Sequence, residues 1–208
     1  MSERYAELTK IPAQPAAKLL AFANCKLETK LKAPASASVQ AVLEELEDAG
    51  AYVDIINMLS CSLPPRERIW WGCLAARELV PEGETSRALA AAEKWVFQPS
   101  DDTREAARQA AEMSDPNDDT SLAAVAVAMH DGKLGGGELQ EFQAPPGATA
   151  KYVFGLNLLA MGEHEENFEA HGQIVIDRAL DIARGGNGTI EAKGGSEELA
   201  EPSTQETG

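Results

Sequence analysis

The chain has 208 residues, 44% of them hydrophobic, and a formal net charge of −16. This length suits one domain with tails, and the apolar fraction is sufficient for a hydrophobic core. An acidic chain repels nucleic acid and anionic membrane, so we expect neither as a partner and consider a protein partner compatible with the charge. No stretch approaches the ~18 consecutive apolar residues that a membrane span needs, and residues 1–10 lack the pattern of a secretory signal.

The three cysteines, Cys25, Cys61 and Cys73, are odd in number, and no two of them are close in the sequence. This spacing argues against both a disulfide framework and a zinc ribbon. Cys61 and Cys73 lie among apolar neighbours, as buried thiols of a reducing compartment do. We therefore expect a cytoplasmic protein.

The N-terminal segment differs from the rest in charge. Residues 1–32 carry six Lys or Arg and three Asp or Glu, whereas the remainder of the chain is acidic. Leucines at helical spacing predict a short amphipathic helix within residues 15–29, and residues 33–38, APASAS, are typical of a linker. We therefore expect residues 1–35 to be a basic, weakly ordered arm that docks on this molecule or on a partner.

Apolar residues at helical spacing predict eight further helices. They cover residues 38–50, 52–60, 62–80, 89–96, 100–113, 122–129, 148–161 and 165–183. Ser38 and Ser100 are candidate N-caps, and Pro99 disfavours helical geometry at the residue before it. Because no segment shows convincing period-2 alternation, the fold class is all-α: a single irregular bundle of about eight helices, built from stacked helix hairpins, over residues 36–188. The composition of residues 189–208 predicts a disordered acidic tail.

The stretch at residues 62–80 is the centre of this prediction. Pro64 and Pro65 fit the first turn of a helix, where a missing N–H is not needed. One helical face then follows at i, i+3, i+4 and i+7: Trp70, Cys73, Leu74 and Arg77. This face predicts that Trp70 lies in the core, while Trp71 points roughly 100° away and meets different neighbours.

Residues 131–147 form the longest irregular stretch inside the predicted domain. Loops of this length without secondary structure are often functional. The loop therefore supports one alternative function, an enzyme of unknown chemistry with a cleft beneath it.

A metal site is the first specific chemistry to consider. We place His164 and His171 on one predicted helix, where residues seven apart are separated by about 10.5 Å along the axis. Histidine nitrogens bind a zinc ion at ~2.1 Å, so these two cannot share an ion without a third element. We therefore expect no metal-binding residues.

Other catalytic and cofactor motifs are also incomplete. The glycines at residues 135–137 follow no predicted strand and precede no Gly-Lys-Ser/Thr. A calcium loop starting at Asp115 would have Thr120 and Ala126 where Gly and Glu are required. Cys73 is flanked by core residues, and its pairing with His130 stays an alternative. We predict no catalytic residues and no cofactor.

Several arginines and tryptophans form the candidate site. Trp and Arg are enriched at the energetic centres of protein interfaces, so these residues are a candidate protein-interaction patch. They are Arg66, Arg68, Trp71, Arg77, Trp95 and Arg104. The structural alternative is that the arginines anchor helix ends by ion pairs and stacking.

Some of these residues belong to a longer recognisable pattern. It comprises YVDII at residues 52–56, LPPRERIWWGCLAAR at 63–77, WV at 95–96, and DIARGGNG at 181–188. The pattern resembles an uncharacterised family of bacterial helical domains with an LPxRExxWWxCLxxR motif, over about residues 40–188. Some members are encoded among type VI secretion genes, beside spike and spike-adaptor proteins. One departure is HDGK at residues 130–133, where the family resemblance implies Ser-Gly-Gly.

The resemblance implies a cytoplasmic accessory role. We expect a non-catalytic protein-binding adaptor or chaperone-like protein, monomeric or weakly oligomeric, with a secretion spike or effector component as partner. The alternatives are the enzyme with a cleft under the loop and a purely structural subunit.

Overall fold

The computed structural model describes residues 3–190. Within that part of the chain it contains nine α-helices and no β-strand, which confirms the all-α fold class. The α-helices are α1 (Ala16–Phe22), α2 (Val39–Asp48), α3 (Tyr52–Ser62), α4 (Pro65–Ala76), α5 (Arg87–Phe97), α6 (Asp101–Glu112), α7 (Ser121–Ala128), α8 (Ala148–Gly162) and α9 (Phe168–Arg184). Four 3₁₀ turns are η1 (Glu3–Tyr5), η2 (Arg77–Leu79), η3 (Gly137–Glu141) and η4 (Glu165–Asn167). Each helix of residues 3–190 is too short or too polar to cross a bilayer.

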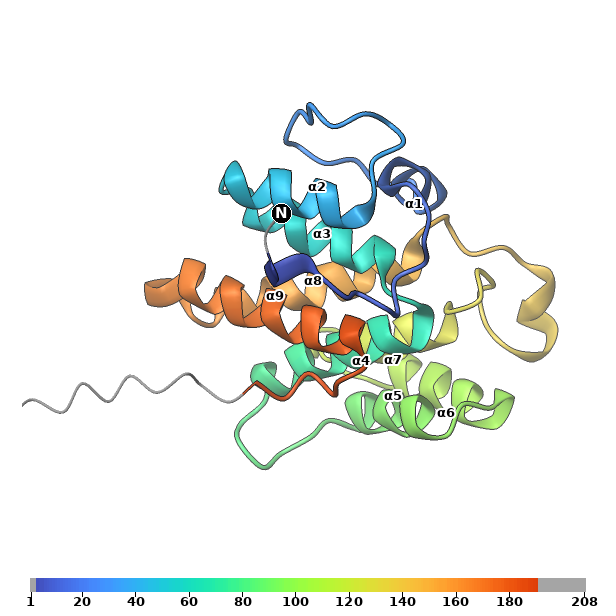
Figure 1. The fold of residues 1–208 in the computed structure, drawn as a ribbon. Coiled ribbons are helices and arrows are strands. Elements are labelled where there is room, and N and C mark those ends of the chain that lie inside the picture. The colour runs from blue at the N-terminus through green and yellow to red at the C-terminus, as the bar shows by residue number, and fades with distance from the viewer. Residues whose placement is uncertain (1–2, 191–208) are drawn as a thin grey trace, which may run out of the picture.

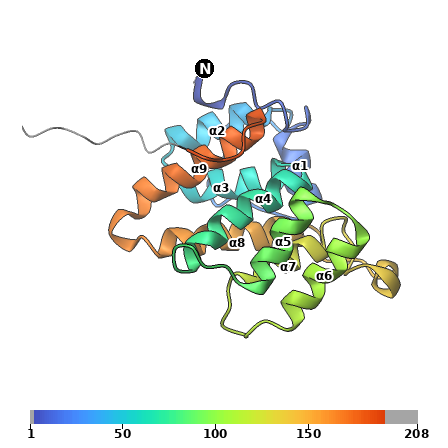
Figure 2. The same ribbon diagram turned by 90° about the horizontal axis from the view of Figure 1, so that it is seen from below.

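The helices are arranged around α4 and α8, which make the most extensive helix–helix contact. Helices α1, α2 and α3 lie on one side of this pair, and α5, α6 and α7 lie on the other (Figures 1 and 2). Helix α9 crosses α3, α4 and α8. From α4 to α9 each helix contacts the next one, as expected for stacked hairpins.

N-cap side chains mark the beginning of several helices. The Ser38 side chain accepts a hydrogen bond from the Ala41 N–H, and Ser86 accepts one from Leu89. Ser100 and Thr103 form a reciprocal capping box at the start of α6. These side chains satisfy N–H groups that have no partner inside the helix, so they fix where each helix begins.

Helix α4 approaches α8 closely at Gly72. A Cβ placed there would lie 3.0 Å from a methyl carbon of Val153, so a larger residue would push the two helices apart. The neighbouring Trp71 is fully buried, and its indole N–H donates to the Val175 carbonyl of α9 at 3.0 Å. One turn of α4 thereby holds both α8 and α9 in place.

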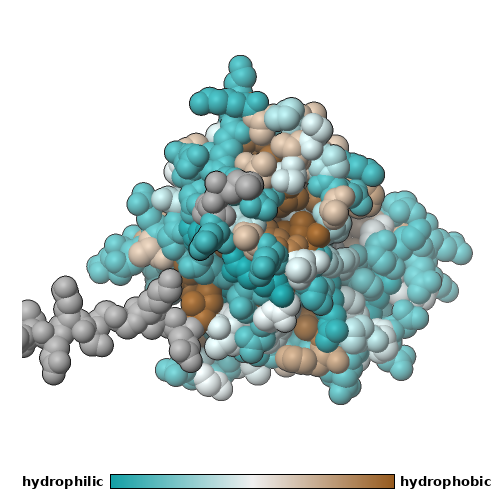
Figure 3. All heavy atoms as spheres, in the orientation of Figure 1, coloured by the Kyte–Doolittle hydropathy of each residue, from teal (hydrophilic) through white to brown (hydrophobic). Residues whose placement is uncertain are grey.

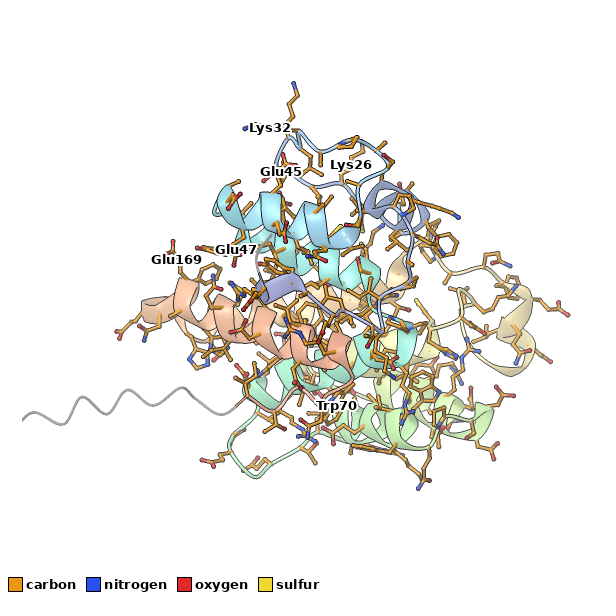
Figure 4. All side chains as sticks on the ribbon, viewed as in Figure 1. Lys26, Lys32, Glu45, Glu47, Trp70 and Glu169 are labelled. Carbon is orange, nitrogen blue, oxygen red and sulfur yellow. The ribbon has the colours of Figure 1, made fainter. Side chains whose placement is uncertain are left out.

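Trp70 has a different environment from the one predicted. It is only partly buried, its ring meets Phe97 edge-on at 5.3 Å, and its N–H donates to the Asn187 carbonyl at 2.7 Å. Figure 4 labels it in the lower part of the molecule, where α4 faces α5. The two tryptophans have exchanged their expected roles because α4 is covered on several sides, so helical spacing does not identify one core face.

The N-terminal segment lies against the body along most of its length. Tyr5 is fully buried, Arg4 pairs with Asp177 and Glu47, and the Lys10 N–H donates to the Ala183 carbonyl at 2.8 Å. The expected boundary at residues 33–38 is therefore bridged by contacts. The segment docks in cis because it offers a large aromatic side chain as well as positive charge.

Two carboxylates of the body hold the later part of this segment. Asp54 accepts hydrogen bonds from the Glu28 and Thr29 N–H groups at 3.0 and 2.7 Å. Glu45 accepts from the backbone of residues 32 and 33, and these bonds lower the pKa of its carboxyl. Glu45 and Lys32 lie together at the top of Figure 4. The predicted acidic tail falls on residues 189–208, and its part from residue 191 lies outside the described residues.

We predict that Trp71→Ala lowers the free energy of unfolding by ~3–5 kcal/mol, because it opens a cavity and leaves a carbonyl unpaired. Trp70→Ala should cost only ~1–2 kcal/mol, since that side chain is already partly exposed. Urea unfolding followed by circular dichroism measures both. Equal losses would contradict the assignment of Trp71 as the core tryptophan.

We also predict that trypsin cuts the native chain slowly at Lys26, Lys30 and Lys32. Asp54→Asn and Glu45→Gln should each accelerate this cleavage, because a neutral amide is a weaker acceptor than a carboxylate. Asp48→Asn, an exposed carboxylate on α2, is the matched control. Rates that stay unchanged in both test variants would show that these carboxylates do not hold the segment.

Candidate functional site

Three of the predicted patch residues are buried. Trp71, Trp95 and Arg104 expose 3% of their surface or less, so they cannot contact a partner. Arg104 donates to the Ala128 carbonyl from two nitrogens, at 2.9 and 2.6 Å, and binds Asp131 with two more bonds at 2.8 and 2.7 Å. Arg104 therefore caps the C-terminal end of α7 and anchors the loop that follows. This is the structural role, anchoring of helix ends, that was the alternative to an interaction patch.

Arg68 and Trp95 also make internal contacts. Arg68 donates to the Cys61 and Leu63 carbonyls at the end of α3. Trp95 packs on His130 with ring centres 4.6 Å apart, and burial lowers the pKa of that histidine. These contacts leave Arg66 and Arg77 as the predicted patch residues that are exposed.

Arg66 and Arg77 flank an exposed aromatic pair. The Arg77 guanidinium lies 5.1 Å from the centre of the Trp70 ring, and Arg66 donates to the Val96 carbonyl at 2.6 Å, beside Phe97. Phe97 is 62% exposed although its ring packs against Trp70. We call Arg66, Trp70, Arg77 and Phe97 the aromatic–arginine surface.

A cavity of about 360 Å³ lies beneath the loop at residues 131–147, where the enzyme alternative requires a cleft. Cys61, Arg68 and His130 line it, together with residues 143–149. The Nε atom of Arg68 is buried without a hydrogen-bond partner, and no carboxylate within residues 3–190 forms an ion pair with this arginine. Helix α8 begins at the cavity wall without a side-chain cap, so the site has the charge that suits an anion.

Cys25 and Cys61 are brought together by the docked N-terminal segment. A hydrogen bond from the Cys61 thiol lowers the pKa of Cys25 to about 7, and the positive charges of Lys151 and Arg68 act in the same direction. The pKa of Cys61 is raised by the same contact and by burial. The sequence did not indicate this pair, because the contact depends on how residues 1–35 dock.

A further polar cluster joins three elements. Glu78 comes from η2, His164 from the connection between α8 and η4, and His171 and Arg178 from α9. The Glu78 carboxylate contacts His171 Nε2 at 2.7 Å and His164 Nε2 at 3.4 Å, and also pairs with Arg178. The two imidazole rings stack with centres 3.9 Å apart.

The expectation that His164 and His171 share one continuous helix is wrong. Helix α8 ends at Gly162 and α9 begins at Phe168, so His164 lies in the turn before α9. The chain reverses there, which removes the axial separation on which the prediction rested. The sequence contained a signal for this break in Gly162 and Asn167, since these residue types are common where helices end.

The comparison with protein families matches residues 42–183 to a family of unknown function, DUF6931. The chain belongs to this family. The match confirms the resemblance to an uncharacterised family, and its limits fall inside the predicted span of residues 40–188. No curated protein and no solved structure matches the chain.

The DUF6931 region contains the cavity floor, the aromatic–arginine surface and the Glu78–His171 pair. The docked segment at residues 3–41 lies before it. Cys25, Phe22 and Ala23 therefore contribute to the cavity region from outside the family match.

We predict that Cys25 is the most reactive of the three thiols towards iodoacetamide at pH 7, because it is partly exposed and its pKa is lowered. Its rate should rise with pH with a midpoint near 7. Cys61→Ala removes the thiol donor of that contact and should change the midpoint, whereas Cys73→Ala, at a fully buried position elsewhere, should not. Peptide mass spectrometry measures the rates. Faster labelling of Cys73 than of Cys25 would contradict this assignment.

Proposed function

We propose that this DUF6931 protein is a non-catalytic protein-binding module that acts as an adaptor or chaperone-like accessory protein. The observation that carries the proposal is the aromatic–arginine surface. Aromatic residues and arginine supply most of the binding energy at protein interfaces. The surface combines both types where α4 and the following turn η2 face the end of α5.

The aromatic pair is already fixed in position. Trp70 is held by Phe97, by Arg77 above its ring and by the hydrogen bond to Asn187. A partner that covers Phe97 therefore meets a rigid platform, and little conformational entropy is lost on binding. Phe97 itself offers apolar area that only a partner can bury.

The charge around the pair indicates the type of partner. Arg66 and Arg77 are positive groups on a chain whose net charge is −16, and Arg77 already pairs with Glu93 at 2.6 Å. Figure 3 shows a largely hydrophilic face with few hydrophobic areas, the largest near its centre. We propose a protein segment that places an apolar side chain on Phe97 and a carboxylate beside Arg66. That this segment belongs to a type VI secretion spike or effector component is a finer proposal, and it rests on the family resemblance alone.

The burial of the Cys73 thiol supports a non-catalytic role. Cys73 is fully buried, and burial raises the pKa of its thiol, so it does not supply a thiolate at neutral pH. His130 is packed against Trp95 and bonded to the Val127 carbonyl. Cys73 therefore lacks the exposure that a nucleophile requires, and the ring of His130 is engaged with Trp95 and the Val127 carbonyl.

A ligand-binding or enzymatic role at the loop cavity is the second candidate. The observation that favours it is Arg68, whose Nε is buried at the cavity without a partner. An anionic ligand that enters the cavity would supply that partner.

We predict that Phe97→Ser and Arg66→Glu each weaken partner binding at least tenfold, while lowering the melting temperature by only about 2–4 °C, because both side chains are exposed and each makes one contact with the rest of the protein. The partner is first captured from native lysate with the full-length protein and identified by mass spectrometry. Its affinity for each variant is then measured by calorimetry. Met113→Ser is the matched control, because Met113 is 68% exposed at the end of α6 and lines neither candidate site.

Binding that both substitutions leave intact would overturn the assignment of this surface. Binding that is lost in Arg68→Gln but kept in Phe97→Ser would favour the loop cavity instead.

A further inference from the structure

The polar cluster formed by Glu78, His164 and His171 has a second property that the proposed function does not use. One ligand-type atom of each side chain lies within 4.8 Å of the other two. The residues come from η2, from the α8–η4 connection and from α9, so the fold itself brings them together. Glu78 and His164 are 86 positions apart in the sequence, so their convergence depends on the tertiary fold.

The buried part of the cluster contains two unsatisfied polar atoms. His171 is only 8% exposed, and its Nε2 has no hydrogen-bond partner. Glu78 Oε2 is also buried and unpartnered, although the two atoms are 2.7 Å apart. At this distance the two atoms form an ion pair if His171 is protonated, and no well-aligned hydrogen bond joins them. A neutral His171 instead places a nitrogen lone pair beside a carboxylate oxygen, which is how two ligands of a cation are arranged.

An ion pair within the protein does not account for the whole arrangement. Arg178 already pairs with Glu78 Oε1 and balances the charge of the carboxylate. A second and a third positive group on the same carboxylate would repel Arg178 and each other. Neutral imidazoles, which offer lone pairs, fit the stacked geometry of His164 and His171 better than two cations do.

We propose that Glu78, His164 and His171 bind a divalent transition metal of the zinc type. Two imidazoles and one carboxylate are a common ligand set for zinc with a fourth position left open. Bonds of ~2.0–2.1 Å in tetrahedral geometry place ligand atoms about 3.3 Å apart, and the 3.4 Å between His164 and Glu78 matches this value. When the ion enters, the closer His171–Glu78 pair moves apart, and the exposed His164 ring turns out of the stack so that its nitrogen lone pair points at the ion.

The surroundings support this assignment. Arg178 fixes the orientation of the carboxylate, which is the usual task of a residue outside the ligand set. The side chain of His164 is 45% exposed and borders a hollow lined by residues 162–167, so the fourth position opens to solvent. Glu163, Glu165 and Glu166 make the rim of that hollow negative, which attracts cations. The metal links η2 to the α8–α9 connection, and this site shares no residue with the aromatic–arginine surface.

The test measures Zn²⁺ binding to the untagged full-length chain by calorimetry and by metal analysis after dialysis. We expect one ion per chain, a rise in melting temperature with zinc, and the absorption bands of a nitrogen- and oxygen-coordinated ion when Co²⁺ replaces zinc. His164→Ala and Glu78→Gln should each weaken zinc binding at least about tenfold. His130→Ala is the control, since this remaining histidine of the sequence packs on Trp95.

His164→Ala is the decisive variant, because the exposed position of this side chain keeps the fold intact. The proposal is overturned if the wild-type chain binds no stoichiometric zinc. It is equally overturned if zinc binds and His164→Ala leaves both the affinity and the zinc-dependent rise in melting temperature unchanged, since the ion then lies elsewhere on the acidic surface.

Discussion

The close contact between α4 and α8 at Gly72 determines where the other parts of the molecule lie. Because a glycine faces Val153 there, the two helices approach closely, and Trp71 reaches past them to the Val175 carbonyl of α9. The outer side of α4 is then left to carry Trp70 and the aromatic–arginine surface. The end of α4 leads directly into η2, which presents Glu78 to the turn that follows α8. Both proposed sites therefore depend on one helix whose own position is fixed by a residue without a side chain.

Much of the fold could be predicted from local signals. The helix-start signals act within one helical turn, so they can be read directly from the sequence. They are the N-caps Ser38 and Ser100 and the prolines at the start of α4. The roles of Trp70 and Trp71 were not predictable in the same way. Helix α4 contacts α5, α7, α8 and α9. The spacing of apolar residues along α4 does not show which of its faces these neighbours bury most deeply. The docking of the N-terminal segment was also missed in part, because Tyr5 and the acceptors Asp54 and Glu45 are far apart in the sequence.

The candidate sites were less predictable than the fold. Arg104 and Arg68 looked like surface residues because arginine usually is one, yet their partners are backbone carbonyls at helix ends, which composition does not show. The opposite error concerned His164 and His171. A single assumed helix kept them apart, and a break of a few residues before Phe168 brings their rings together. Small displacements of a helix boundary thus have little effect on a fold prediction and a large effect on a site prediction.

The contact between the N-terminal segment and the loop has a consequence for access to the cavity. Gly147 has a left-handed φ of +69°, and a Cβ at that position would lie 2.0 Å from the Ala23 carbonyl oxygen. The end of the loop and the end of α1 are therefore fitted to each other with no space between them, and Phe22 and Ala23 form part of the cavity wall. The N-terminal segment therefore narrows the opening of the cavity, and a chain that lacks residues 22–23 would have a wider opening.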